Sequence, residues 1–248
     1  MPRTARKQSF TGIYHVVLRG IDRQKIFKDD SDYRKYISLL NELKSICGYE
    51  LYAWCLMPNH IHILFKVGSE SLDMIFRRIG VRFVYWYNAK YDRVGHLFQD
   101  RYKSEPVENE SYLLTVTRYI HHNPLKAKLC SKLSEYKYSS YHDYIFNNGI
   151  SDTAFLTRMI GMENFIEYHN DNCDDNCMEH NTVIRKRITD DQLIKIARDQ
   201  LACCDVKSIR SFDKIKRRKA IDLLLDSGGS IRQISRLTGM TPHQVRGS

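Results

Sequence analysis

Two histidines set two residues apart carry the clearest chemical signal in this sequence of 248 residues. His60 and His62 lie in the run Met57-Pro-Asn-His-Ile-His-Ile-Leu64, which is typical of a strand end, a tight turn and a second strand. Because side chains alternate between the two faces of a strand, both imidazoles should point the same way. Two such imidazoles can bind one divalent metal ion. An isolated His-x-His pair, however, is more often structural.

A tyrosine and an asparagine four residues apart strengthen this signal. Tyr119 and Asn123 fall on one face of a predicted helix, so Asn123 can offer an amide oxygen to the same metal ion. A phenol, with a pKa of about 10, is a poor nucleophile at neutral pH. It needs an electrophile such as a phosphate that a metal ion has polarised. Tyr112 is a rival nucleophile two turns earlier, but the residue four positions after it, Val116, cannot bind a metal ion.

The composition favours a partner that is a polyanion with exposed bases. The chain has 39 Lys and Arg against 29 Asp and Glu, a net charge of +10, and 16 tyrosines. Cations pair with phosphates and aromatic rings stack on bases, although ordinary surface charge is the alternative explanation. With 42% hydrophobic and 27% charged residues the chain can bury a core, which argues against a disordered protein.

The sequence also bears on the cellular compartment. No stretch approaches the roughly 18 apolar residues of a membrane span, and no apolar segment follows the basic N-terminus as it would in a secretory signal. The seven cysteines are scattered, which is typical of reduced thiols. We therefore expect a cytoplasmic protein.

The charge pattern divides the chain into three parts. Residues 1–150, 151–184 and 185–248 carry net charges of +8, −6 and +8. The middle part is rich in Asn and Asp, which favour turns and solvent. We therefore predict one domain over 1–150, an acidic linker over 151–184 and a second, helical region over 185–248.

The first part alternates between strand and helix patterns, in the order strand, helix, strand, strand, helix, strand, helix. This order predicts an α+β fold with a ferredoxin-like antiparallel sheet and one added helix. Ser31 is the expected N-cap of the first helix, and the Asn123-Pro124 step is expected to end the third. The expected elements are the strands 13–19, 50–57, 60–67 and about 98–107, and the helices from 31 to Gly48, from 71 to about 90 and from 108 to about 121.

The last part is predicted to be helical over 190–201 and 212–225. After these, Gly239 stands where a tight turn between two helices needs a positive φ, and Thr241 can cap the helix that follows. This is a helix-turn-helix pattern, which predicts DNA binding. A plain helical bundle is the alternative.

Five motifs in this order resemble the single-tyrosine HUH transposases, and most closely the branch of REP-associated tyrosine transposases. The resemblance covers residues 1 to about 145. The motifs are Tyr14-His-Val-Val-Leu-Arg-Gly20, Met57-Pro-Asn-His-Ile-His-Ile-Leu64, Gly95-His-Leu-Phe-Gln-Asp-Arg-Tyr-Lys-Ser104, Tyr119-Ile-His-His-Asn-Pro-Leu-Lys-Ala127 and Tyr138-Ser-Ser-Tyr141.

The resemblance implies a reaction and a set of roles. The protein would bind single-stranded DNA with a hairpin, cleave it through a 5′-phosphotyrosine intermediate and rejoin strands, as a monomer or a homodimer. Tyr119 would be the nucleophile, and His60, His62 and Asn123 would bind Mg²⁺ or Mn²⁺. The third ligand is a glutamine in some relatives, so Asn123 reaches less far. No nucleotide cofactor is expected, since the sequence has no Gly-x-x-x-x-Gly-Lys loop.

Other polar residues have weaker assignments. Arg19, Arg23, Arg101 and Lys103 lie in or near the motifs, and Arg77, Arg78 and Arg82 lie on one side of the second helix. All seven are candidates for DNA binding, with solvated charge as the alternative. His169, Cys173, Cys177 and His180 have spacings that a zinc site could use, but the usual Cys-x-x-Cys pair is absent.

Two other functions compete with that of a DNA-cleaving enzyme. The first is a DNA-binding regulator without catalysis, which would use the basic C-terminal helices. The second is a metalloenzyme acting on small molecules through His60 and His62, which the net positive charge disfavours.

Overall fold

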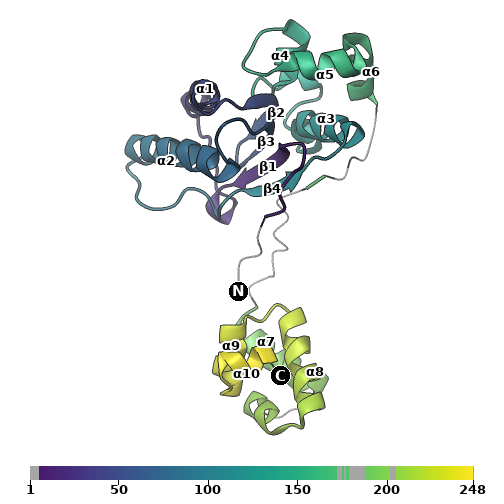
Figure 1. Ribbon diagram of the computed structural model, residues 1–248. Coiled ribbons are helices and arrows are strands. Elements are labelled where there is room, and N and C mark those ends of the chain that lie inside the picture. Colours follow the sequence, from purple (N-terminus) through teal and green to yellow (C-terminus); the bar gives the residue numbers. More distant parts are fainter. Residues whose placement is uncertain (1–5, 172–174, 176, 179–187, 202–204, 248) are drawn as a thin grey trace. The chain divides into compact units, whose positions relative to one another are not determined.

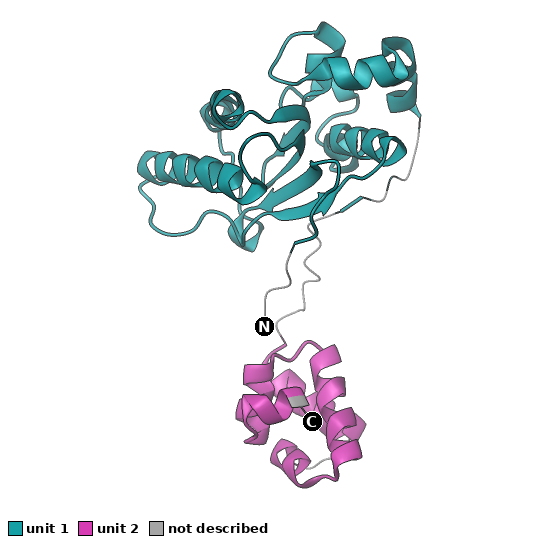
Figure 2. Cartoon of the chain, viewed as in Figure 1, with its two compact units in different colours: residues 1–180 teal, residues 181–248 magenta. Residues whose placement is uncertain are grey.

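The computed structural model of the protein describes residues 6–171, 175, 177–178, 188–201 and 205–247. The chain forms two compact units, which Figure 2 colours separately: unit 1 is Met1–His180 and unit 2 is Asn181–Ser248. The division falls within the segment predicted to link two domains.

Unit 1 is built on a four-stranded antiparallel sheet (Figure 1). The strand order β2-β3-β1-β4 is that of a ferredoxin-like fold, so the predicted α+β palm is confirmed. Only the fourth strand is much shorter than expected, since Phe98 makes just an isolated bridge with Gly20. The strands are β1 (Ile13–Arg19), β2 (Glu50–Met57), β3 (His60–Lys66) and β4 (Lys103–Pro106).

The register of β1 and β3 decides which residues share a face of the sheet. Val17 pairs with His62 and Arg19 pairs with His60, and residues directly opposite each other in an antiparallel pair project to the same side. The odd-numbered residues of β1 and the even-numbered residues of β3 therefore form one face. Their neighbours in the chain form the other.

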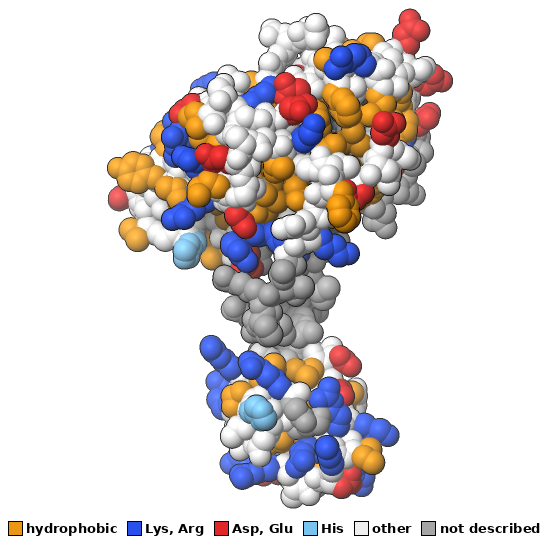
Figure 3. Space-filling model, in the orientation of Figure 1, with side chains coloured by type: hydrophobic (Ala, Val, Ile, Leu, Met, Phe, Trp, Pro, Cys, Tyr) orange, Lys and Arg blue, Asp and Glu red, His pale blue; other side chains and the backbone are white. Residues whose placement is uncertain are grey.

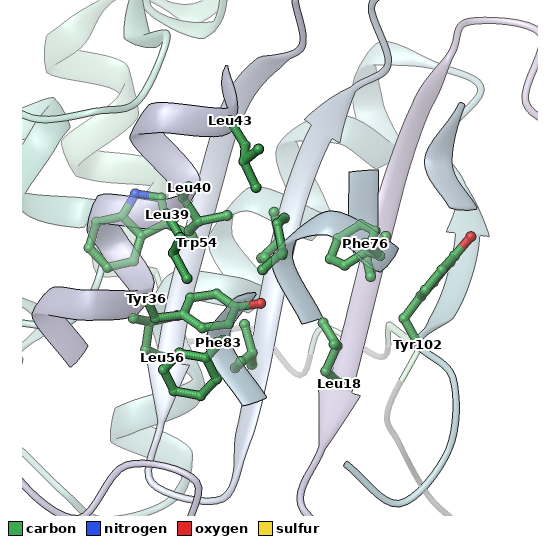
Figure 4. Close-up of a cluster of buried hydrophobic side chains, with 14 of the residues drawn as sticks. Leu18, Tyr36, Leu39, Leu40, Leu43, Trp54, Leu56, Phe76, Phe83 and Tyr102 are labelled. Atoms are coloured by element: carbon green, nitrogen blue, oxygen red, sulfur yellow. The ribbon is translucent and has the colours of Figure 1, made fainter. Parts of the chain in front are cut away.

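Two long helices cover the second face, α1 (Asp30–Cys47) and α2 (Leu72–Lys90). Figure 4 shows how their apolar side chains meet those of the strands, with Leu40 of α1 near Trp54 and Phe83 of α2 beside Tyr36 of α1. The N-cap of α1 is Asp29 and not the predicted Ser31, because the Asp29 carboxylate accepts hydrogen bonds from the amides of Ser31 and Asp32.

The first face is covered by α3 (Glu110–Lys126), the helix that carries Tyr119 and Asn123 (Figure 1). Contrary to prediction, this helix does not end before Pro124. A proline removes only one amide donor, and the following turn still closes through the Ala127 amide, which donates to the Asn123 carbonyl at 2.9 Å.

The predicted acidic linker over 151–184 begins as ordered structure. After α4 (Tyr141–Phe146), residues of this segment form α5 (Thr153–Ile160) and α6 (Met162–Asn170). Leu156 and Phe165 are fully buried in the same core as α3. The net charge of the segment did not predict these helices, because two buried apolar side chains are enough to hold short helices whose other residues are polar.

Asp175, farther along the acidic segment, does not lie in solvent either. Its carboxylate accepts two hydrogen bonds from the Arg118 guanidinium of α3, at 2.6 and 2.8 Å, and both side chains are only 7% exposed. Arg118 also donates to the Tyr168 carbonyl. This ion pair holds the acidic segment against the helix of Tyr119.

Unit 2 is helical, as predicted, and has its own apolar core. Gly239 adopts φ +70° between the last two helices, and Thr241 accepts a hydrogen bond from the Gln244 amide at 3.2 Å, so both predicted turn signals are confirmed. Its helices are α7 (Asp190–Leu201), α8 (Lys214–Asp226), α9 (Ile231–Thr238) and α10 (Pro242–Gly247). Within the described ranges of both units, no helix combines the length and apolarity that crossing a bilayer requires.

Candidate functional site

A cavity of about 220 Å³ lies between α3 and the sheet, and its walls bring together the four residues predicted to carry the chemistry. They come from β3 and α3, which lie far apart in the sequence. The lining residues are Arg19, Met57, His60, His62, Tyr119, Asn123, Lys126 and Ala127.

The ring of His62 contacts both the ring of His60 and the phenol ring of Tyr119. The rings of His60 and His62 lie 5.0 Å apart between centroids, and the ring of Tyr119 lies 5.6 Å from that of His62, edge to face. Tyr119 is only 2% exposed and belongs to the core beneath α3, but it also lines the cavity. Its position therefore allows the phenol to meet a group that enters the cavity.

His15 of β1 supports this pair from behind. Its Nε2 lies 3.1 Å from Nδ1 of His62, and the two rings stack with centroids 5.4 Å apart. Complete burial lowers the pKa of His15 to about 3, so the ring is neutral and has one donor and one acceptor nitrogen. Because His62 Nδ1 contacts His15, a metal ion would be bound by Nε2 of His62.

Glu105 lies near the other nitrogen of His15, beyond hydrogen-bond distance. Oε2 of Glu105 in β4 lies 4.0 Å from His15 Nδ1, and the Tyr112 hydroxyl donates to the same oxygen at 2.7 Å. Tyr112 thus serves Glu105 and does not line the cavity, which disfavours it as a nucleophile. His15 was not predicted as part of the site. Alternation along β1 could have indicated it, because His15 lies two residues before Val17, which pairs with His62, and so projects from the same face.

Asn123 and Lys126 complete the helix side of the cavity. The Asn123 amide nitrogen donates to the Tyr119 carbonyl at 2.8 Å, which leaves its oxygen as the atom that can bind a metal ion. The Lys126 ammonium lies 4.8 Å from the centroid of the Tyr119 ring and donates to the Asp175 carbonyl at 3.0 Å. Lys126 was not predicted, but it is seven residues after Tyr119 and therefore on the same face of α3.

The donor set suits a hard divalent ion with open positions. His60, His62 and Asn123 line one cavity and can offer two imidazole nitrogens and one amide oxygen. Mg²⁺ or Mn²⁺ accepts such a set when water or phosphate oxygens fill the remaining positions. Among the described residues, no three His, Cys, Asp or Glu side chains gather as a metal site. Asn123 is accordingly the candidate for the third protein ligand.

The predicted DNA-binding residues fall into three groups. Arg19 lines the cavity, and Lys103 pairs with Val17 on the same sheet face. Arg23 is exposed at the end of the short 3-10 helix that follows β1, Ile21–Arg23. The remaining four belong to the opposite side of the sheet.

Those four arginines differ in their contacts: two form ion pairs within the protein and two line a hollow. Arg78 donates two hydrogen bonds to Glu70, at 2.9 and 2.8 Å, and Arg82 pairs with Glu42, so both are engaged within the protein. Arg77 and Arg101 instead line one hollow beside α2.

The proposed zinc quartet is only partly described, because Cys173 and His180 lie outside the described residues. His169 is buried in a histidine network: its Nδ1 donates to the Phe165 carbonyl at 2.8 Å, and its Nε2 lies 2.9 Å from His121 Nδ1. Cys177 is buried in the core beside α3. Both nitrogens of His169 thus have protein partners, which disfavours it as a zinc ligand.

Residues 8–123 match the family of IS200-like transposases. Among solved structures, a REP-associated tyrosine transposase bound to a REP hairpin aligns with a TM-score of 0.50 and 17% identity, over 59% of this chain and 86% of that chain. A putative transposase from Deinococcus radiodurans aligns with a TM-score of 0.35 and 16% identity, over 48% of this chain and 96% of that chain. A comparison with curated proteins found no match. The resemblance seen in the sequence is confirmed over these residues, and the REP-associated structure confirms the fold.

The histidine network beside the site predicts loss of stability in mild acid. Burial holds the pKa of His121 well below its usual value and lowers that of His169 to about 3. The unfolded chain takes up protons near pH 6.5, whereas the folded state does not. The free energy of unfolding should therefore fall by about 1.4 kcal/mol per pH unit for each histidine as the pH drops from 6 to 4.

Urea unfolding followed by circular dichroism at successive pH values measures this slope. The double variant His121→Gln, His169→Gln should have a shallower slope, whereas His96→Gln, at an exposed position, should match the parent. A slope unchanged in the double variant would contradict the prediction.

Proposed function

We propose that this chain, whose residues 8–123 carry the IS200-like transposase domain, cleaves and rejoins single-stranded DNA beside a hairpin, with Tyr119 as the nucleophile. The observation that carries the proposal is the convergence of Tyr119, His60, His62 and Asn123 on one cavity. A hairpin partner is supported by the fold of the REP-associated transposase, which is bound to such DNA.

The reaction is a transesterification. The phenolic oxygen of Tyr119 attacks the phosphorus, its proton passes to water, and the bond from phosphorus to the 3′ oxygen breaks. The products are a 5′-phosphotyrosine and a 3′-hydroxyl, which takes up a proton. Attack by another 3′-hydroxyl reverses the step and joins strands, so no nucleotide triphosphate is consumed.

The side chains around the cavity have distinct tasks in this scheme. Arg19 and Lys126 supply positive charge where the phosphate must lie. The Lys126 ammonium also lies over the Tyr119 ring and favours the phenolate that develops during attack. His15 is a positioning residue, because its contact fixes which nitrogen of His62 faces the cavity.

Mg²⁺ or Mn²⁺ is the proposed cofactor, held by His60, His62 and Asn123. When bound, the ion would withdraw charge from the phosphate and so make the phosphorus a better electrophile.

Unit 2 is proposed to be a second DNA contact. Residues 185–248 carry a net charge of +8, and Figure 3 shows Lys and Arg side chains over much of the visible face of this unit. The turn between α9 and α10 follows the helix-turn-helix pattern, with exposed Arg232 and Arg246 on the two helices. If unit 2 alone bound DNA and unit 1 did not react, the protein would be a regulator.

Replacing Tyr119 by Phe should abolish covalent protein–DNA adducts while hairpin binding stays within about twofold of the parent, because only the nucleophilic oxygen is lost. The adduct is measured by denaturing gel electrophoresis with a labelled hairpin and Mn²⁺. Tyr112→Phe is the matched control and should still form adducts. Adducts that persist in Tyr119→Phe and vanish in Tyr112→Phe would reverse the assignment, and no adduct in the parent with any hairpin would favour the regulator.

Replacing His15 by Phe should weaken Mn²⁺ binding about 10- to 100-fold, because Phe fills the space but cannot contact His62. His15→Gln keeps a polar atom and should retain most of the affinity. Titration calorimetry of the DNA-free protein measures both values, with circular dichroism to check folding and His142→Ala as the control outside the site. Equal affinities in the Phe and Gln variants would refute the role of His15.

Removing two cations from unit 2, in the double variant Arg232→Ala, Arg246→Ala, should reduce the slope of log affinity against log salt by about 1 for each phosphate that the protein no longer neutralises. Fluorescence anisotropy with a labelled DNA hairpin at several salt concentrations gives the slope. Arg158→Ala, an exposed cation of α5, is the control. A parental affinity and slope in the double variant would exclude this surface from DNA binding.

A further inference from the structure

A hollow runs along α2 on the side of the sheet opposite Tyr119. Two adjoining cavities of about 760 and 390 Å³ share their central walls and form one continuous groove, which we call the α2 groove. Its floor is α2 and its other wall is the segment 96–101. Figure 3 shows hydrophobic side chains exposed over α2. The residues common to both cavities are Phe76, Arg77, Gly80, Phe98, Asp100 and Arg101.

The groove carries two exposed apolar side chains of α2. Val81 and Tyr85 lie one helical turn apart, whereas Val84 beside them packs partly against the core. Val81 is 65% exposed and Tyr85 is 80% exposed. Large side chains at such exposure on a groove wall are typical of a surface that meets a ligand.

Gly80 leaves open space in the middle of this floor. A Cβ atom built at Gly80 would meet no atom within 4 Å, so no neighbour in the described structure requires a glycine there. Glycine inside a helix weakens it, and the backbone of Gly80 does not have a positive φ that would call for glycine. A ligand that approaches the helix closely would account for the missing side chain.

The charges of the groove suit a nucleotide. Arg77 makes no ion pair with a described residue, in contrast to Arg78 and Arg82 of the same helix, and Arg101 lies across the groove from it. Guanidinium groups pair with phosphates, whereas the aromatic rings beside them can stack on a base. The Asp100 carboxylate can accept a hydrogen bond from a base amino group.

The groove and the site cavity lie at the same end of β1, on its two faces. Leu18 lines the groove, and the next residue, Arg19, lines the cavity of Tyr119. The Gln99 amide, in the groove wall, donates to the Arg19 carbonyl at 2.9 Å. A DNA strand that passes around this end of the sheet can therefore occupy both.

We propose that the α2 groove binds an unpaired base of the same single strand whose phosphate enters the cavity of Tyr119. The inference rests on the proposed function and adds to it a second binding site, which recognises a base by stacking and its phosphate by Arg77 and Arg101. A second copy of this chain is the competing occupant.

The test uses the full chain and a labelled DNA hairpin with a single-stranded tail, compared with the same hairpin whose tail consists of abasic nucleotides. The abasic tail keeps the phosphates and lacks the stacking surfaces. The parent protein should bind the normal tail more tightly, by about 5- to 150-fold. Gly80→Leu, which fills the floor, and Tyr85→Ala, which removes a ring, should each lose most of this difference.

Matched controls separate the groove from general damage. Ala89→Leu adds the same side chain to an exposed position of α2 outside the groove, and Phe146→Ala removes an exposed ring elsewhere in unit 1; both should bind like the parent. Gly80→Ala should raise Tm by about 2–4 °C, since the helix gains a better former. A parental preference for the normal tail in Gly80→Leu and Tyr85→Ala would overturn the proposal, as would equal binding of both tails by the parent.

Two further readouts distinguish the alternatives. If sedimentation shows a dimer that Gly80→Leu dissociates, the groove is an interface between copies and the proposal is wrong. Adduct formation at Tyr119 is assayed in parallel. If the parent protein prefers the normal tail but forms no adduct, the inference about the groove stands and the proposed function is wrong. If the parent protein forms adducts but does not prefer the normal tail, the proposed function stands and the inference is wrong.

Discussion

The packing of α3 against one face of the sheet is the constraint on which the candidate site depends. His62 comes from the central strand β3 and Tyr119 from α3, and their rings touch only because the helix lies flat on this face. Val116 and Ile120 of α3 are fully buried on the side of the helix that faces the sheet, and their burial holds the helix in place. A shift of β3 by one residue would turn both histidines to the opposite face, since side chains alternate along a strand. The site is thus specified by the same contacts that stabilise the core.

β1 connects this site with the rest of unit 1. His15 supports His62 on the face of α3, whereas Leu18 lies on the other face with α1 and α2 (Figure 4). The two faces meet at Arg19 and Gly20, where the strand ends and the segment 96–99 is tied to it by backbone hydrogen bonds. One strand therefore orients a candidate metal ligand and also forms part of a groove that could receive the flanking DNA.

The charged side chains have different surroundings in unit 2 and in the acidic segment. In unit 2 the basic side chains surround a small apolar core, and two of them, Arg218 and Arg236, pair with Asp222 and Asp190. In the acidic segment Asp175 is buried against Arg118, where it neutralises a cation of the helix that carries Tyr119. A net charge summed over a segment describes only its long-range attraction or repulsion, because it does not say which charges are paired inside the fold.

The sequence by itself determined the order of the four strands and the first three helices, and it indicated the four residues that line the candidate site. Alternation placed His60 and His62 on one face, helical spacing placed Tyr119 and Asn123 on one side of α3, and both patterns are local properties of the chain. Only the tertiary structure decided that His15 and Lys126 join them, that Arg77 faces a groove while Arg78 is paired, and that α5 and α6 replace an expected linker. These facts depend on strand register and on packing between segments distant in the sequence, which spacing along a single chain does not encode.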